Sequence, residues 1–342
     1  MWKQAAVGLC VMSMSGMVAW GNGPAPYVDP SQEFVVSAIP GQPQYDPCLW
    51  GDYVAWQGVS GDVYAKSLKS GEIIPVSVGQ GGSSWLNANG NRIVWDTWVI
   101  SQVHVFDLTT RTTSTFGTHG ESPDVYGNLI VWHDGNILGK DLGSGQDYQF
   151  SSSSGPENHL NNPRVWGDIV VWNEWGNGNL WASRISTGDV FPVTAGGTVD
   201  WPPHDVQGNI VVWRDRRNVH GDNNLDIYAA DISDPSHVVE FPVCTNPFEQ
   251  SSPEVYGNII VWCDGRNGDE DIYGYDIASR TEFPIAVGPG NQFDPSIYES
   301  TVVWSTELGG EVGIHGNTIV PEPAALSLLA TAGMVLARKR RR

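Results

Sequence analysis

The sequence is poor in basic residues and in cysteines. Its 342 residues contain 18 Lys and Arg against 38 Asp and Glu, for a formal net charge of −20 at pH 7. A chain with that charge repels phosphates, so nucleic acid is not expected as a partner. The four cysteines show no CxxC or Cys/His spacing, so a zinc site is not expected either; they are Cys10, Cys48, Cys244 and Cys263.

Familiar catalytic motifs and helical patterns are also missing. There is no GxSxG, no HExxH and no phosphate-binding loop, and the eight histidines are scattered along the chain. Apolar residues form short β-branched runs or alternate with polar ones, and neither pattern has a helical period. The sequence therefore predicts an all-β protein and favours no enzyme class.

What the sequence does contain is a repeat, clearest from Val255 to Ile285. A Gly-Asn turn precedes an apolar run ending in Trp, and a loop, an alternating strand and a last extended piece follow. A four-stranded repeat of about forty residues is typical of a β-propeller blade. The run ending in Trp occurs seven times, which predicts seven four-stranded antiparallel blades; the anchors are Trp56, Trp95, Trp132, Trp172, Trp213, Trp262 and Trp304.

The last repeat runs out of chain before a fourth strand. It has extended pieces at Pro295 to Tyr298, Thr301 to Ser305 and Glu311 to His315, whereas Glu33 to Ser37 stands alone before the first repeat. We expect this N-terminal strand to complete the last blade, since that pairing closes the ring and removes a sheet edge.

The tryptophans divide into two groups. We interpret the seven anchors as packing between blades. The alternative, stacking against sugars, applies better to tryptophans outside the anchor position that fall in or near loops, such as Trp85, Trp98, Trp175 and Trp201.

Both ends of the chain carry targeting patterns. Residues 1–23 have one cation, Lys3, an apolar stretch and then small residues, which is typical of a secretory signal peptide. Residues 320–342 contain Pro321-Glu322-Pro323, a short apolar stretch that predicts a helix, and a basic end, which together indicate a membrane stop. Residues 24–319 are then an exported propeller. In such a protein Cys244 and Cys263 are the most plausible disulfide, with unpaired buried thiols as the alternative.

The C-terminal pattern resembles a PEP-CTERM sorting signal. The resemblance covers the last 23 residues and lies in Pro321, Glu322 and Pro323, the apolar stretch, and the cluster that begins Arg338, Lys339, Arg340. It implies a bacterial protein of the cell envelope or surface, anchored in the membrane by its tail transiently or permanently. It also implies an exosortase as the partner that processes this tail.

The repeats themselves resemble TolB-like (PD40-type) propeller repeats, through Trp262, Asp264, Arg266 and the run Asp271-Ile272-Tyr273. The usual TolB propeller has six blades, so a count of seven departs from it. Some seven-bladed relatives are polysaccharide lyases with a His-rich metal site, but here only His204 falls near a channel strand. The first hypothesis is therefore a non-catalytic binding or matrix protein for protein or polysaccharide, and the alternative is a lyase-like enzyme.

One position of the repeat predicts a binding site. First strands line the channel of a propeller, and the residues three before each turn include Asp124, Arg164, Asp205 and Glu254. They predict a partly acidic ring that binds a cation or a polar ligand. The alternative is a hydrated channel whose charges compensate one another.

Two loops predict a metal site. Asp222 and Asp226 flank Asn224, and Asp269 and Asp271 follow Asn267, so oxygen ligands occur at every second residue, as suits Ca²⁺. No distal Glu completes an EF-hand, and the alternative is that these residues cap turns. No cofactor other than calcium is expected.

Overall fold

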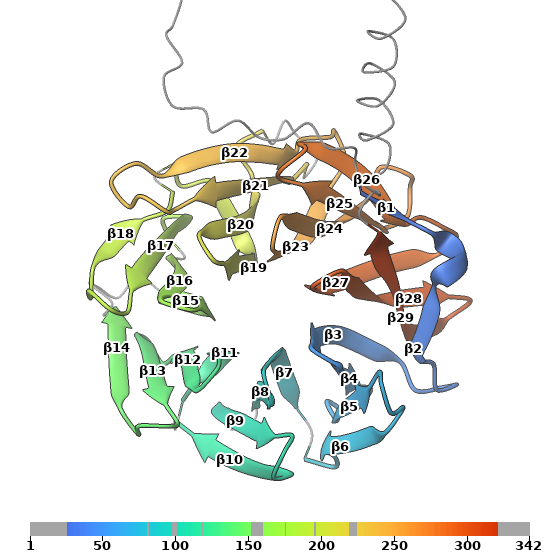
Figure 1. Cartoon of the computed structure of the whole chain (residues 1–342), viewed down its shortest axis with the longest axis horizontal. Coiled ribbons are helices and arrows are strands. Elements are labelled where there is room, and N and C mark those ends of the chain that lie inside the picture. The colour runs from blue at the N-terminus through green and yellow to red at the C-terminus, as the bar shows by residue number, and fades with distance from the viewer. Residues whose placement is uncertain are drawn as a thin grey trace, which may run out of the picture.

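The computed structural model describes residues 26–80, 82–97, 101–117, 119–151, 160–174, 176–194, 196–218 and 224–320. In this part of the chain seven antiparallel sheets surround a central axis, which confirms the predicted seven-bladed β-propeller (Figure 1). The predicted signal peptide, C-terminal apolar helix and sorting motif lie outside the described residues. Within them, no helix is long and apolar enough to cross a membrane.

Six blades are four-stranded meanders in chain order, with the first strand innermost (Figure 1). Blade 1 contains β3 (Gln44–Trp50), β4 (Tyr53–Gly58), β5 (Val63–Ser67) and β6 (Ile73–Ser77). Blade 2 contains β7 (Ser83–Asn89), β8 (Arg92–Thr97), β9 (Gln102–Asp107) and β10 (Thr112–Phe116). Blade 3 contains β11 (Glu121–Tyr126), β12 (Leu129–His133), β13 (Ile137–Asp141) and β14 (Asp147–Ser151).

The next three blades repeat this order. Blade 4 contains β15 (Leu160–Trp166), β16 (Ile169–Glu174), β17 (Asn179–Arg184) and β18 (Val190–Pro192). Blade 5 contains β19 (Val199–Gln207), β20 (Ile210–Asp215), β21 (Asp226–Asp231) and β22 (Val239–Cys244). Blade 6 contains β23 (Gln250–Tyr256), β24 (Ile259–Asp264), β25 (Asp271–Asp276) and β26 (Thr281–Ala286).

Blade 7 is closed by the N-terminus, as predicted. It contains β27 (Asn291–Tyr298), β28 (Thr301–Leu308) and β29 (Glu311–Val320), and β2 (Phe34–Ser37) pairs with β29 through Phe34 and Gly316. The third strand is longer than expected, and its end pairs with a second short N-terminal strand, β1 (Tyr27–Val28). A 3₁₀ turn, η1 (Pro30–Gln32), joins β1 to β2.

The turn between the first and second strands requires a left-handed backbone. Gly257 in blade 6 has φ 60°, a conformation that glycine adopts without steric cost. Blade 7 has Glu299 at this position, and it adopts φ 54° despite its side chain. Blade 7 therefore forms the same turn as the other blades, although the residue at this position is not glycine.

The anchor tryptophans form the interfaces between blades. All seven are buried, with exposed fractions of 8% or less. Each belongs to a cluster that joins its own blade to the preceding one, so Trp95 packs with Ile74 of blade 1 and Trp304 with Phe283 of blade 6. Trp56 packs with Val36 and Ile314 of blade 7, which closes the ring. The interpretation of the anchors as packing residues is confirmed.

The three cysteines in the described residues are buried and free. The alternative of unpaired buried thiols is therefore confirmed, and the disulfide between Cys244 and Cys263 is wrong, because the two side chains lie in different interfaces. Cys244 packs in the interface between blades 5 and 6, and Cys263 packs in the interface between blades 6 and 7. Burial raises the pKa of the Cys244 thiol to about 12 and that of Cys263 well above its usual range.

The closing strand offers a test with a matched control. Val36 is 2% exposed, whereas its neighbour Val35 is 54% exposed. We expect Val36→Ala to lower the free energy of unfolding by about 2 kcal/mol, because it leaves a cavity between blades 7 and 1. Val35→Ala should change it by less than about 0.5 kcal/mol. Denaturant unfolding measures both, and equal effects of the two substitutions would show that β2 does not seal the ring.

Candidate functional site

The seven residues at the predicted ring position all line one cavity of about 110 Å³ on the propeller axis. They are Cys48, Asn87, Asp124, Arg164, Asp205, Glu254 and Ser296. A β-bulge lies just before this position in every first strand, and it changes the alternation of side chains there. The structure thus brings together the four residues predicted as a ligand-binding ring.

Five of the seven ring side chains also bond to the backbone of the next blade. Carboxylate or hydroxyl oxygens accept from backbone N–H groups in four cases, and the amide of Asn87 donates to a carbonyl in the fifth. The pairs are Asp124 with Val165 N at 2.7 Å, Asp205 with Val255 N at 2.9 Å, Glu254 with Ile297 N at 3.1 Å, Ser296 with Leu49 N at 3.0 Å, and Asn87 with Pro123 O at 2.9 Å. These hydrogen bonds link neighbouring blades around the axis.

The electrostatics of the ring favour partial neutralisation. Burial, together with the charge of Asp205, raises the pKa of Glu254 to about 8. Burial raises the pKa of Asp205 to about 6, although the Val255 N–H and Arg164 act against it. At pH 7 the protonated form of Glu254 is therefore favoured. Burial also raises the pKa of Asp124, and the charge of Arg164 and the Val165 N–H act against this rise. Binding of a cation or polar ligand by this ring stays a prediction.

His204 lies beside the ring and is 2% exposed. Burial and the charge of Arg164 lower its pKa to about 3, so it is neutral at physiological pH. The channel brings no second histidine to the cavity lining. Within the described part of the chain, no group of three or more His, Cys, Asp or Glu side chains is placed to hold a metal ion.

Below the ring, aromatic side chains fill one mouth of the channel. They occupy the position directly before each turn, on what we call the turn face, the side of the propeller that carries the turns between first and second strands. The aromatic cluster consists of Trp50, Tyr126, Trp166, Tyr256 and Tyr298, all half-buried. Their rings contact one another across the axis, with centroids of Trp50 and Trp166 5.6 Å apart and of Trp50 and Tyr298 4.5 Å apart.

Blades 2 and 5 have amides at this position. The Asn89 side chain accepts a hydrogen bond from the N–H of Gly127 in the next blade at 3.1 Å, and Gln207 accepts one from Gly257. The aromatic cluster was not predicted, although five repeats carry a Trp or Tyr directly before the turn.

The opposite mouth opens into a pocket of about 330 Å³. Its lining includes Asp46, Asp294, Ser252 and Trp85 as well as Arg164 of the ring. Burial and the nearby Asp46 raise the pKa of Asp294 to about 8. Of the tryptophans considered for sugar stacking, Trp85 lies here. Trp98, Trp175 and the side chain of Trp201 lie outside the described residues.

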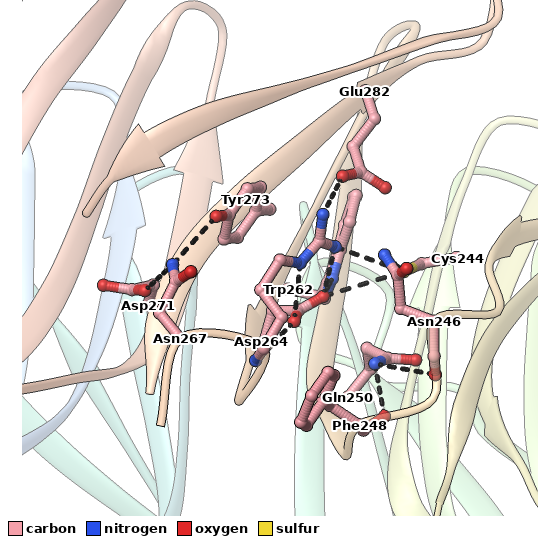
Figure 2. Close-up of polar contacts among 11 residues, drawn as sticks. Cys244, Asn246, Phe248, Gln250, Trp262, Asp264, Asn267, Asp271, Tyr273 and Glu282 are labelled. Atoms are coloured by element: carbon pink, nitrogen blue, oxygen red, sulfur yellow. Dashed lines mark hydrogen bonds and ion pairs between the residues drawn. The ribbon is translucent and has the colours of Figure 1, made fainter. Parts of the chain in front are cut away.

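The residues predicted to bind calcium are held by neighbouring amides. Asp226 accepts from Asn218 Nδ2 at 2.6 Å. Asp271 accepts from Asn267 Nδ2 at the same distance (Figure 2), and both aspartates are fully buried. They belong to different blades, and Asp269 is half-buried in the loop before β25. Asp222 lies outside the described residues. The geometry favours the alternative reading, in which these carboxylates order their loops.

An adjacent network uses the same loop (Figure 2). The buried Asp264 accepts from Trp262 Nε1 at 3.0 Å and from Arg266 Nε at 2.8 Å. The Arg266 guanidinium also lies 4.0 Å over the ring of Tyr273 and pairs with Glu282. Burial acts to raise the pKa of Asp264, but the Arg266 and Trp262 hydrogen bonds outweigh it and the pKa is lowered. Blade 5 repeats this arrangement with Trp213, Asp215, Arg217 and Tyr228.

The Asp264 network predicts a large loss of stability on neutralisation. We expect Asp264→Asn to lower the free energy of unfolding by about 3 kcal/mol at pH 7, because it leaves the half-buried Arg266 without the charged carboxylate that accepts from its backbone N–H, Nε and Nη2. The control is Asp269→Asn in the same loop, with an expected change below about 0.5 kcal/mol. Denaturant unfolding at pH 7 measures both, and a loss for Asp264→Asn no larger than that of the control would contradict the network's role.

The ring predicts that the free energy of unfolding falls as the pH rises. The pKa of Glu254 in the folded state lies above its value in the unfolded state. Its contribution to the stability of the folded state is therefore fully present below about pH 4 and is lost as the pH rises through about 8. Glu254→Gln removes this loss while keeping an oxygen for Ile297 N. Relative to wild type, the variant should gain roughly 4 kcal/mol of stability between about pH 5 and about pH 9.

The matched control for this measurement is Glu299→Gln, which removes an exposed carboxylate beside the turn of blade 7. Its stability should run parallel to that of wild type over the whole pH range. If Glu254→Gln also ran parallel to wild type, Glu254 would not titrate near pH 8.

Comparison with protein-family models and with curated proteins finds no match. Solved propellers are similar in structure. An oligogalacturonate lyase from Vibrio parahaemolyticus has 14% identity and a TM-score of 0.60, covering 88% of this chain and 99% of that chain. The β-propeller domain of the Trilobed protease from Pyrococcus furiosus has 11% identity and a TM-score of 0.59, covering 82% and 94%.

TolB from Acinetobacter baumannii is also similar, with 13% identity, 80% of this chain and 78% of that chain covered, and a TM-score of 0.47, which is too low to carry an argument. At these identities the likenesses show the fold alone. They include enzymes such as the lyase as well as TolB. The chain is therefore similar to known β-propellers in its architecture, and its activity has to be argued from its own residues.

Proposed function

We propose that this protein is a non-catalytic binding propeller of the cell envelope or surface, and that it binds extracellular polysaccharide on its turn face. The observation that carries the proposal is the aromatic cluster. Five half-buried rings from five blades meet at the channel mouth. Such a gathering of aromatic side chains at the centre of one face is typical of a binding surface.

The chemistry around the cluster suits a polyhydroxylated ligand. The apolar C–H faces of sugar rings pack against aromatic faces, while hydroxyl groups require hydrogen-bond partners at the edge. Exposed polar residues follow five of the six turn glycines on this face, among them Asp52, Asn128, Asp168 and Asn258. An aromatic centre with a polar rim therefore fits sugars better than a purely apolar partner.

The location is a proposal that rests on the sequence of the two ends. Residues 1–23 and 320–342 support export, followed by recognition of the tail by an exosortase. A surface location places the propeller where extracellular polysaccharide occurs, and a binding role agrees with the missing catalytic motifs. A matrix protein of the cell surface is a special case of this function.

Binding of the purified full chain to a glycan array tests the proposal. We expect binding to at least one polysaccharide, and we expect Trp50→Ala and Trp166→Ala to weaken it at least tenfold, because each removes a ring from the centre of the cluster. Trp166→Phe, which keeps a ring, should retain most of the binding. Thermal unfolding of each variant shows whether it is folded.

Trp85→Ala is the control, since Trp85 lies at the opposite mouth. If Trp85→Ala lost binding and Trp166→Ala did not, the binding site would lie on the opposite face of the propeller. Failure of the wild type to bind any polysaccharide would overturn the proposed function. Shortening of a bound polysaccharide by the protein would favour the lyase alternative.

A further inference from the structure

A groove on the turn face leads away from the aromatic cluster. It lies between blades 3 and 4 and has a volume of about 380 Å³. Tyr126 belongs both to the cluster and to the lining of this groove, so the two surfaces are continuous. The other lining residues are Gly127, Asn128, Leu129, Asp141, Tyr148, Gly167, Asp168 and Ile185.

Two tyrosine rings mark the ends of the groove. Tyr126 ends the innermost strand of blade 3 and packs on Trp166, with ring centroids 4.9 Å apart. Tyr148 lies on the outermost strand, β14, and stacks on Phe150 with centroids 5.6 Å apart and an interplanar angle of 5°. Three strand spacings separate β11 from β14, or roughly 14 Å. The groove is therefore longer than one sugar ring, and its two aromatic ends are held in place by neighbouring rings.

The charges of the groove select against anions. Asp141 and Asp168 line it, and no basic side chain is among its described lining residues. The nearby Arg92 is occupied by the Gly127 carbonyl, to which it donates at 2.6 Å, and its charge helps to lower the pKa of Asp141. Hydrogen bonds from the backbone and hydroxyl of Ser144 lower the pKa of Asp141, so it is ionised at neutral pH. Asp168 is held by the backbone N–H of Ser186 at 2.7 Å. Carboxylates in this position accept hydrogen bonds from hydroxyl groups and repel uronate or sulfate groups.

We propose that this groove carries an extended, uncharged polysaccharide chain, which runs from the aromatic cluster at Tyr126 outward to Tyr148. The inference rests on the proposed function and adds to it the class of ligand and the path of the chain. The polysaccharide lies along the groove between blades 3 and 4, its sugar faces pack against the two tyrosines, and its hydroxyls bond to the two aspartates. The net charge of −20 adds to the preference for an uncharged ligand.

Calorimetry with the full chain tests the path. The probes are neutral glucan, mannan and galactan oligosaccharides of increasing length, and oligogalacturonates of the same lengths. Affinity for one neutral series should rise at least tenfold from the shortest to the longest member. Tyr148→Ala should abolish this rise and leave the affinity for the shortest member within about twofold, because only long chains reach Tyr148. Phe248→Ala, which removes an exposed aromatic ring before β23, is the control and should behave as wild type.

The outcomes separate the inference from the function on which it rests. If Trp166→Ala weakens binding and Tyr148→Ala does not, the ligand sits on the cluster alone and the groove is not its path. If oligogalacturonates bind as well as the neutral series, the ligand class is wrong. If wild type binds none of the probes and no polysaccharide on the array, the proposed function itself fails.

Discussion

The structure depends on the packing of one tryptophan per blade against the blade before it. A four-stranded meander has two faces to bury and cannot cover both with its own residues. Each anchor, such as Trp213 or Trp262, is fully buried only because the neighbouring blade supplies the other wall of its cluster. Seven such interfaces form a ring only if the last blade also meets the first, and the packing of Trp56 with Val36 and Ile314 provides that contact.

A second set of contacts works at the axis, where the blades are closest. The side chains at the ring position reach from one first strand to the backbone of the next, so that Glu254 binds Ile297 and Ser296 binds Leu49. These contacts bring several carboxylates close together in a small cavity, where their charges repel one another. Protonation of Glu254 reduces this repulsion. The stability of the propeller and the charge at its axis are therefore linked. Because the ring side chains already bond to the next blade, they are less available to bind a ligand.

The proposed binding surface follows from the same geometry, two residues further along each first strand. Two residues after the ring position, the side chains reach the mouth of the channel, where the five rings of the aromatic cluster meet. Trp50 and Trp166 belong to blades on different sides of the axis, yet their ring centroids are 5.6 Å apart. Because the rings are held by each other and by the strands beneath them, they present a rigid surface for a ligand at little entropic cost.

The blades, their number and the closing strand could all be predicted from the amino-acid sequence. These features are local, since each blade is a meander of adjacent strands with its turn glycines and its Trp in regular register. The tertiary structure alone decided what meets at the axis, because that depends on residues as far apart as Leu49 and Ser296, 247 positions along the chain. It showed that the ring carboxylates clasp blades, that Cys244 and Cys263 lie in different interfaces, and that residues before the turns form the aromatic cluster. A repeat predicts which residues are equivalent, but the curvature of the ring decides which of them touch.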